Sequence, residues 1–423
     1  MSLGQFLYTA ATWGLSPLVP VLLSRRSRRG KEDPARLNER LARDLTERPV
    51  GRLVWMHGAS VGESQILLGF ADQMSQLDGD MRFLFSCQTL TASRLITDRK
   101  PDGSLHQMAP VDTPAIARRF LDHWHPDLAI FAEGEIWPNL LREARRQGVP
   151  SILANARMTE KSQRSWARWP TLARNLFGGF DLILPADDKT ASSMKALAGK
   201  PVQAPHNLKR GLPPPPVNSC EVQTLKRDFV AGRPCIVAAS THPGEERLVL
   251  DAIGGLNDDV VLVLVPRHPE RGAEVSELLS NRGLNFSRRS LGENADAHTS
   301  VLLADTIGEM GLWFALADAV FLGGASVEGI GGHNPIEPLQ LGKPVVTGPH
   351  GFNFQDLFDD LQSTDLLTIA RDGDELARCL RDFADGTARL PESALASFLN
   401  EAKGPLKAAA RDALALLNER AEA

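Results

Sequence analysis

The chain has little that points to metal, redox or nucleic-acid chemistry. Its 423 residues include four cysteines, and no two of them have the C-x-x-C spacing of a zinc knuckle or a redox pair. Scattered cysteines of this kind are typical of a reducing compartment. The formal net charge is −5, and no basic stripe stands out that would suit a nucleic-acid partner. We therefore expect no metal, no cofactor and no nucleic acid.

Two common nucleotide-binding motifs are also missing. There is no G-x-x-x-x-G-K-[ST] segment, which excludes a P-loop, and no G-x-G-x-x-G follows the first expected strand. Long apolar runs are equally scarce, since only one occurs, near the N-terminus. With 43% hydrophobic and 23% charged residues, the composition is that of an ordinary globular protein.

The N-terminal apolar run covers residues 6–23 and is interrupted by Pro17 and Pro20. It falls just short of the ~20 residues that span a bilayer. A basic cluster follows at residues 25–31, where it would favour the cytoplasmic side and anionic lipid. We expect residues 1–31 to be a membrane-associated segment. The alternative is an amphipathic helix packed on the first domain.

The rest of the chain alternates short apolar runs with helical patterns, which predicts parallel α/β sheets. A length of 423 residues favours two domains. Four prolines at 213–216 suggest a spacer. We predict two Rossmann-like domains with an interdomain cleft, at 32–210 and 219–400, joined by a linker at 211–218 and followed by a helix at 401–423. The expected strands are 53–56, 83–86, 128–131, 152–154, 182–184, 236–239, 260–265, 301–303, 319–322 and 345–347.

Polar loops should follow these strands, at the sheet edge where α/β proteins bind ligands. Glu63 would lie in the first turn of a helix, where a carboxylate can act as a general base. Ser60-x-x-Glu63 also fits a capping box, which is a purely structural role. Glu133 and Glu135 follow another strand beside Trp137, and their alternative is a solvated loop. Arg157 offers a guanidinium suited to an anionic sugar or phosphate.

The second half has its own polar loops. Arg267 ends a strand and is placed for an anion, while Glu309 stands in a second possible capping box, Thr306-x-x-Glu309. Glycine pairs at 323–324 and 331–332 precede Asn334 and Glu337. A carboxylate there can accept hydrogen bonds from ribose hydroxyls, so this segment predicts a nucleotide pocket.

Taken together, these motifs resemble the bacterial 3-deoxy-D-manno-octulosonic acid (Kdo) transferases. The resemblance covers most of the chain in order. It rests on the N-terminal segment and on residues 55–63, 110–112, 133–139, 155–157, 207–209, 240–246, 266–268, 305–309 and 331–338. The chain departs from the family pattern at Gly134, where threonine is usual, and at Lys161, His206, Leu339 and Gln340.

The resemblance implies a GT-B fold, CMP-Kdo as donor and the lipid A precursor as acceptor, at the cytoplasmic side of the inner membrane. It implies an inverting, metal-independent displacement. The implied catalytic residues are Glu63 as general base, Glu133 and Glu135; the implied substrate-binding residues are Ser60, Arg157 and Lys209; the implied CMP-binding residues are Arg267, Glu309, Asn334 and Glu337. The alternatives are a transferase for another nucleotide sugar, a sugar-nucleotide epimerase, and an inactive membrane scaffold that binds CMP.

Overall fold

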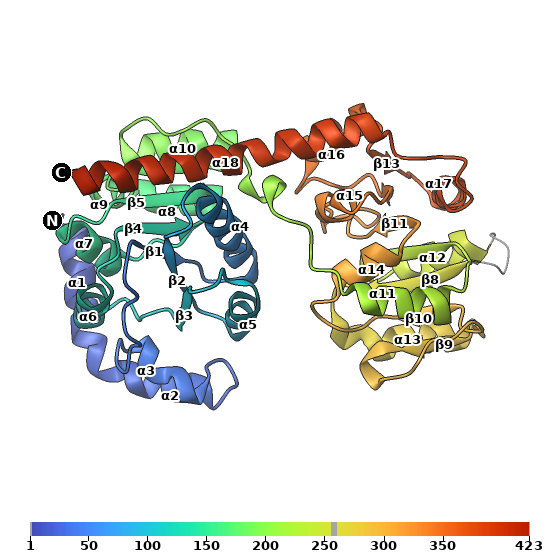
Figure 1. Ribbon diagram of the computed structural model, residues 1–423, viewed down its shortest axis with the longest axis horizontal. Helices are drawn as coiled ribbons and strands as arrows, with labels where there is room; N and C mark the ends of the chain where they lie inside the picture. Colours follow the sequence, from blue (N-terminus) through green and yellow to red (C-terminus); the bar gives the residue numbers. More distant parts are fainter. Residues whose placement is uncertain (1, 255–259, 423) are drawn as a thin grey trace. The chain divides into compact units, whose positions relative to one another are not determined.

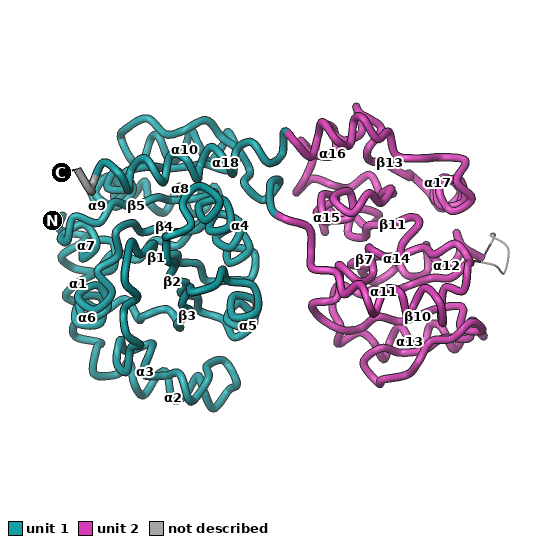
Figure 2. Tube along the Cα trace, viewed as in Figure 1, with its two compact units in different colours: residues 1–212, 401–423 teal, residues 213–400 magenta. Residues whose placement is uncertain are grey.

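A computed structural model describes residues 2–254 and 260–422, which form two compact units. Unit 1 comprises residues 1–212 and 401–423, and unit 2 comprises residues 213–400 (Figure 2). The change from one unit to the other falls between Leu212 and Pro213, at the start of the proline run. Residues 1–31 and 401–423 thus belong to the same unit as the first sheet.

Unit 1 contains a six-stranded sheet in the order β3-β2-β1-β4-β5-β6, and every pair of neighbouring strands is parallel (Figure 1). This is the strand order of a Rossmann fold. The strands are β1 (Leu53–His57), β2 (Arg82–Cys87), β3 (Leu105–Met108), β4 (Leu128–Ala132), β5 (Ser151–Ala156) and β6 (Leu182–Pro185).

Helices cover both faces of this sheet because alternate residues of each buried strand point to opposite sides. In β1, Leu53 and Trp55 face one cluster, while Val54 and Met56 face the other. The first cluster lies under α6 (Pro114–Trp124), α7 (Pro138–Arg146), α9 (Pro170–Phe177) and α10 (Asp188–Ala198). The second lies under α4 (Val61–Leu77), α5 (Leu90–Arg99) and part of α18 (Glu392–Glu422).

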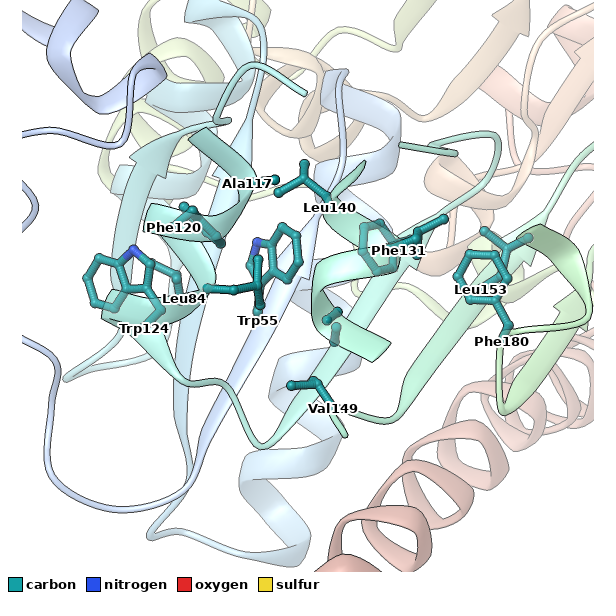
Figure 3. Packing of buried hydrophobic residues seen from close by; sticks show 14 of the residues in the cluster. Trp55, Leu84, Ala117, Phe120, Trp124, Phe131, Leu140, Val149, Leu153 and Phe180 are labelled. Atoms are coloured by element: carbon teal, nitrogen blue, oxygen red, sulfur yellow. The ribbon is translucent and has the colours of Figure 1, made fainter. Parts of the chain in front are cut away.

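Aromatic rings fill the first of these clusters (Figure 3). The Trp55 ring lies 4.9 Å from that of Phe120 and 5.1 Å from that of Phe131, measured between centroids. Phe131 in turn meets Phe180 edge to face. Such tilted contacts add to the free energy gained by burying the rings, and they fix β1 and β4 side by side.

Unit 2 contains a seven-stranded sheet in the order β13-β12-β11-β7-β8-β10-β9, again wholly parallel. Its strands are β7 (Cys235–Thr241), β8 (Val261–Pro266), β9 (Phe286–Arg288), β10 (Val301–Leu303), β11 (Ala319–Leu322), β12 (Val345–Thr347) and β13 (Leu367–Ile369). Its helices are α11 (Ser219–Leu225), α12 (Glu245–Gly254), α13 (Gly272–Asn281), α14 (Met310–Leu316), α15 (Ile336–Gln340), α16 (Gln355–Ser363) and α17 (Gly373–Ala384).

All ten expected strands are present, and the prediction of two Rossmann-like α/β domains is confirmed. Three further strands, β3, β9 and β13, were not expected. Each lies at an edge of its sheet and is only three or four residues long. All three contain polar residues, as in the Leu-His-Gln-Met sequence of β3. An edge strand is covered less completely, so its sequence lacks the continuous apolar run of a central strand.

The N-terminal segment is helical, with α1 (Leu3–Leu15), a 3-10 turn (Ser16–Leu18) and α2 (Val19–Ser27). By length and composition, Leu3–Ser27 is apolar enough to cross a membrane, with a mean hydropathy of 1.4. Yet α1 packs against α6, α7 and α9. The Tyr8 hydroxyl donates to Asp112 (2.9 Å) and the Thr9 hydroxyl donates to Asn139 (3.0 Å). These bonds tie the polar side of α1 to unit 1.

The other side of this segment is exposed and apolar. The exposed large hydrophobic residues are Leu3, Phe6, Leu7, Trp13, Leu15, Leu18, Val21 and Leu22. We call this set the N-terminal apolar face. Two short helices, α3 (Leu37–Arg40) and α8 (Glu160–Ala167), complete the set of α-helices in unit 1 within the described residues.

Candidate active site

The polar loops of unit 1 meet where the strand order reverses, between β1 and β4. The chain passes from β1 outward to β3 and then returns to the other side of β1, so loops that follow β1 and β4 are neighbours. Ligands of open α/β sheets bind at this point, beyond the carboxyl ends of the strands. The loop after β1 carries Ser60 and Glu63, and the loop after β4 carries Glu133 and Glu135.

Glu63 lies in the first turn of α4, in a capping box with Ser60. The Ser60 hydroxyl donates to Glu63 Oε1 (3.0 Å) and accepts the Glu63 backbone N–H (3.5 Å). The other carboxylate oxygen accepts the backbone N–H of Ala59. Gly58 allows this close turn, since a Cβ there would lie 3.0 Å from the Glu63 Cβ. Ser60 therefore caps α4, as the sequence pattern indicated, and these bonds hold the Glu63 carboxylate in one position.

Residues 58–62 also fit the G-x-S-x-G pattern of hydrolase nucleophile elbows, between a strand and a helix. In an elbow the serine would be hydrogen-bonded to a histidine. Within the described residues, the Ser60 hydroxyl bonds only to Glu63, while the nearby His57 bonds to Ser86. Ser60 thus serves Glu63 and is not arranged as a nucleophile.

The Glu63 carboxyl is a proton acceptor of raised basicity. Burial raises its pKa, and the charges of Glu135 and Glu133 act in the same direction, against the hydrogen bonds from Ala59 and Ser60. A glutamate tuned upward is better matched to general-base work near neutral pH. The neighbouring carboxylate Glu135 has its pKa moved in the opposite direction, which separates the two groups chemically.

A buried chain of hydrogen bonds leads toward Glu135. Trp55 Nε1 donates to the Ser86 hydroxyl (2.8 Å), which lies 2.8 Å from His57 Nδ1. His57 Nε2 is buried, makes no hydrogen bond within the described residues, and lies 3.5 Å from Glu135 Oε2. His57 is only 1% exposed.

Glu135 receives other donors as well. Trp137 Nε1 donates to its Oε2 at 2.7 Å and Gln88 Nε2 donates at 3.2 Å. Burial acts to raise the pKa of this carboxyl, but the hydrogen bonds and charge of His57 and the bonds from Trp137 and Gln88 outweigh it, so the pKa is lowered. Glu135 therefore stays ionised beside Glu63.

Glu133 is held by cations. Lys209 Nζ lies 2.7 Å from its Oε1, Asn155 Nδ2 donates to the same oxygen at 3.3 Å, and Arg157 Nε lies 3.8 Å away. Both Glu133 and Asn155 have left-handed backbone conformations, with φ of +52° and +51°. Strained residues of this kind persist where the surroundings over-determine them, and they cluster at functional sites. Because both residues lie at the carboxyl ends of β4 and β5, their strained backbones point to a functional site at this end of the sheet.

The structure thus brings together all six residues expected in the first half: Ser60 with Glu63, Glu135 beside Glu63, and Glu133 with Arg157 and Lys209. Sequence reasoning assigned no role to Ser86, Gln88 or His57. Gln88 directly follows β2, next to β1 in the sheet, and that position was the available signal. Ser86 lies inside β2, and only the register that pairs it with His57 reveals it.

Unit 2 reverses its strand order between β7 and β11, and here the buried carboxylate of Glu245 joins the two loops. Glu245 accepts backbone N–H bonds from His242 (2.9 Å), Gly324 (2.8 Å) and Ser326 (3.1 Å). Free backbone N–H groups at the start of a helix can bind a phosphate. The His242 amide is instead occupied by the chain's own carboxylate.

The side chains next to the hydrogen bonds of Glu245 are basic. His242 Nε2 lies 2.9 Å from Nε2 of His333, and the His242 ring meets that of His268 edge to face at 6.0 Å. The charge of Arg267 contributes to lowering the pKa of both His242 and His333. Arg267 itself is exposed, directly after β8.

The other three expected nucleotide-binding residues have structural partners of their own. Glu309 accepts bonds from Arg289 (2.6 Å to Oε1) and from the Thr306 hydroxyl. The expected capping box is not formed, because Glu309 is itself the N-cap residue of α14 and no side chain caps this helix. Asn334 Oδ1 accepts the Ile336 N–H at 3.2 Å. Glu337 is the second residue of α15. All three follow the carboxyl ends of β10 or β11.

The described part of neither unit presents a metal centre. Across residues 2–254 and 260–422, no group of three or more histidine, cysteine or acidic side chains is placed to hold an ion. The arrangement in unit 1 is a pair of carboxylates with separated basicities and nearby cations, which suits proton abstraction and the binding of an acidic substrate.

Comparison with known proteins assigns a class to this arrangement. Among solved structures, a glycosyltransferase from Rickettsia africae superposes with a TM-score of 0.55 at 11% identity, covering 88% of this chain and 99% of that chain. Two parallel Rossmann-like units together with this likeness identify the GT-B fold, the fold of many glycosyltransferases.

The sequence comparisons go further. Residues 35–211 match the family model described as 3-deoxy-D-manno-octulosonic-acid transferase (kdotransferase). The 3-deoxy-D-manno-octulosonic acid transferase of Bordetella pertussis is 34% identical over 85% of this chain and 86% of its own length. A probable mitochondrial 3-deoxy-D-manno-octulosonic acid transferase of Arabidopsis thaliana is 32% identical over 88% of this chain and 86% of its own. The chain belongs to the Kdo transferase family, glycosyltransferases of lipopolysaccharide biosynthesis.

Proposed function

We propose that this enzyme transfers Kdo from CMP-Kdo to a lipid A precursor with inversion at the anomeric carbon, and that Glu63 is the general base. The observation that carries the proposal is the Glu63 carboxylate, fixed by Ser60 and the Ala59 amide at the β1/β4 reversal, with a pKa raised by burial. Family membership supports the donor sugar.

In this mechanism the acceptor hydroxyl attacks the anomeric carbon while Glu63 takes its proton. The bond from that carbon to the phosphate oxygen breaks, and its electron pair leaves with CMP. A single displacement of this kind inverts the configuration. Because Glu135 is kept ionised by His57, Trp137 and Gln88, its charge favours a proton on Glu63 and so increases the basicity of the group.

Substrate binding is proposed for the cationic residues. Kdo carries a carboxylate, and Lys209 and Arg157 at Glu133 provide the cations that such a group requires. Glu133 holds the Lys209 ammonium in place until substrate arrives. Arg267, Asn334, Glu337 and Glu309 are proposed to bind CMP in unit 2. Of these, Glu309 acts through Arg289, because its carboxylate is already paired with that guanidinium.

The site of action is proposed to be the cytoplasmic side of the inner membrane. The N-terminal apolar face supports this, since eight large hydrophobic side chains gather on one exposed helical segment. The exposed Arg25, Arg28 and Arg29 follow directly and would meet anionic headgroups. Because the opposite side of α1 is bonded to Asp112 and Asn139, we propose that the segment lies in the membrane surface.

A transfer assay tests the proposal. The enzyme is incubated with CMP-Kdo and a lipid A precursor, and the product is read by mass spectrometry and by NMR of the anomeric centre. We expect a mass gain of one or more Kdo residues and an inverted configuration. Retention of configuration would contradict the single displacement. No gain with this acceptor, while Kdo still reaches another acceptor, would move the proposal to that acceptor.

A further inference from the structure

Two histidines of unit 2 share a hydrogen bond that the proposed chemistry has not yet used. His242 follows β7, and His333 lies in the glycine-rich segment between β11 and α15. Their Nε2 atoms are 2.9 Å apart, and their ring planes differ by 12°. Both loops belong to the reversal point of the sheet, where a nucleotide is expected.

The short distance limits how many protons the pair can hold. One Nε2 must donate and the other must accept, since two N–H groups cannot face each other at 2.9 Å. The donor ring then has a bare Nδ1, and the acceptor ring carries its proton on Nδ1. The neutral pair can therefore take one more proton, at the bare Nδ1, without losing its shared hydrogen bond.

The pair is also held rigidly. A Cβ at Gly324 would lie 2.9 Å from Nε2 of His333, so only glycine allows the backbone to pass this close. Glu245 accepts the backbone N–H groups of both Gly324 and His242, which couples the two loops. The two imidazoles are therefore held within hydrogen-bond distance by the backbone of their loops as well as by their own hydrogen bond.

The charged groups around the pair disfavour the extra proton in the empty protein. Burial lowers the pKa of His333 to about 4, helped by the charges of His242, Arg267 and His268. Burial also lowers the pKa of His242, and His268, Arg267 and Arg271 act in the same direction against Glu246. Glu246 is largely neutralised by its ion pair with Arg271 at 2.6 Å. An anion placed here would reverse this balance.

We propose that the His242–His333 pair takes up one proton from solvent when the phosphate of CMP binds at this edge, forming a cation that matches the phosphate dianion. The inference rests on the proposed donor site in unit 2 and adds a proton-linked phosphate subsite to it. During transfer, the broken bond leaves its electron pair on the phosphate, which gains a second negative charge. The protonated pair balances that charge, and its proton returns to solvent when CMP leaves.

Calorimetry in buffers of different ionisation enthalpy tests this directly. The slope of the observed binding enthalpy against the buffer's ionisation enthalpy gives the number of protons taken up. At pH 7.5 we expect CMP to bind with uptake approaching one proton, and cytidine, which lacks the phosphate, to bind with none. The pH is chosen because free CMP is then mostly a dianion, its second phosphate pKa being about 6.

Variants show whether the proton is taken up by the histidine pair or by the phosphate. We expect His242→Gln and His333→Gln each to abolish the uptake and to weaken CMP binding about tenfold, while His298→Gln, at an exposed histidine of the same unit, changes neither. Amide exchange of β7 and β11 checks that each variant is folded. If uptake persists in both pair variants, the proton resides elsewhere and the proposal is wrong.

The outcomes also distinguish this inference from the proposed function. CMP binding without proton uptake would overturn the inference and leave the donor site intact. Absence of any CMP binding to the folded enzyme would instead count against the donor site itself.

Discussion

The two units carry a glutamate at the same topological place, yet use it differently. Glu63 and Glu245 both lie in the first turn of the helix that follows the first strand of their sheet. Glu245 is fully buried, and its carboxylate accepts three backbone N–H groups from two loops. Glu63 is only partly buried and accepts one backbone N–H and one hydroxyl.

The difference shows what makes a carboxylate available for chemistry. A carboxylate that is fully buried and accepts backbone N–H groups on both oxygens stabilises the loops around it and is out of reach of a substrate. Burial and like charges act to raise the pKa of both carboxyls, so basicity does not separate them. Glu63 differs because it accepts fewer bonds and is partly exposed, which leaves it able to take a proton from a substrate. Position in the fold alone does not separate the two cases, because the sequence pattern of strand, turn and acidic helix start is shared.

The sharpest test of this contrast is Glu63→Gln. Glutamine keeps the size and the capping interactions but cannot accept a proton, so we expect transfer to slow by about 10²–10⁴-fold. Initial rates by mass spectrometry measure the effect, and CMP affinity should be unchanged. Glu160→Gln, at an exposed glutamate of the same unit that pairs with Arg164, serves as the control. A variant that keeps near-normal turnover would remove Glu63 from the role of base.

The matching change in unit 2, Glu245→Gln, should act on structure. Losing the charge weakens several hydrogen bonds at once, at a cost of about 2 kcal/mol, which is a roughly 30-fold loss of amide protection. We expect faster exchange at Gly324 and Ser326 and little change in the sheet of unit 1. If protection is kept and only the rate of chemistry falls, then Glu245 is itself a catalytic group and the contrast fails.

The cations at Glu133 should differ in importance. Lys209 lies 2.7 Å from the carboxylate and Arg157 lies 3.8 Å away and is more exposed. We therefore expect Lys209→Gln to lower kcat/KM about tenfold and Arg157→Gln to lower it less. Steady-state kinetics with varied CMP-Kdo measures both. The reverse order would mean that Arg157 leaves Glu133 to bind substrate.

The smallest expected effect is on the pH profile. Because the Glu63 pKa is raised in the folded enzyme, kcat/KM should fall as the pH drops through a value above the ordinary glutamate pKa of about 4.3. Removing the neighbouring charge in Glu135→Gln should move this acidic limb to lower pH, since a like charge no longer disfavours ionisation. An unmoved limb would show that Glu135 is not electrostatically coupled to the base.

Sequence patterns predicted the central strands and the first-half site because both depend on local order. A buried parallel strand needs a continuous apolar run, and the loop after it holds polar residues. The positions of Glu63 and Glu133 could therefore be predicted from the apolar residues that directly precede them in the sequence. The hydrogen bonds of Ser86 with Trp55 and His57 could not be predicted, because they depend on the register of β2 against β1. The bond between His242 and His333 joins residues 91 positions apart. Only the folding of two loops around Glu245 brings them together.

The last helix has a consequence for the order in which the protein is made. Within α18, Leu406, Ala409, Ala410, Ala413 and Leu417 complete the core of unit 1, on the face also covered by α4 and α5. The ribosome releases these residues only after all of unit 2. The first sheet must therefore wait with the part of this face that α18 covers still exposed while the second unit is synthesised. A released protein truncated after residue 400 should accordingly bind chaperones through unit 1, even though all of unit 2 is present.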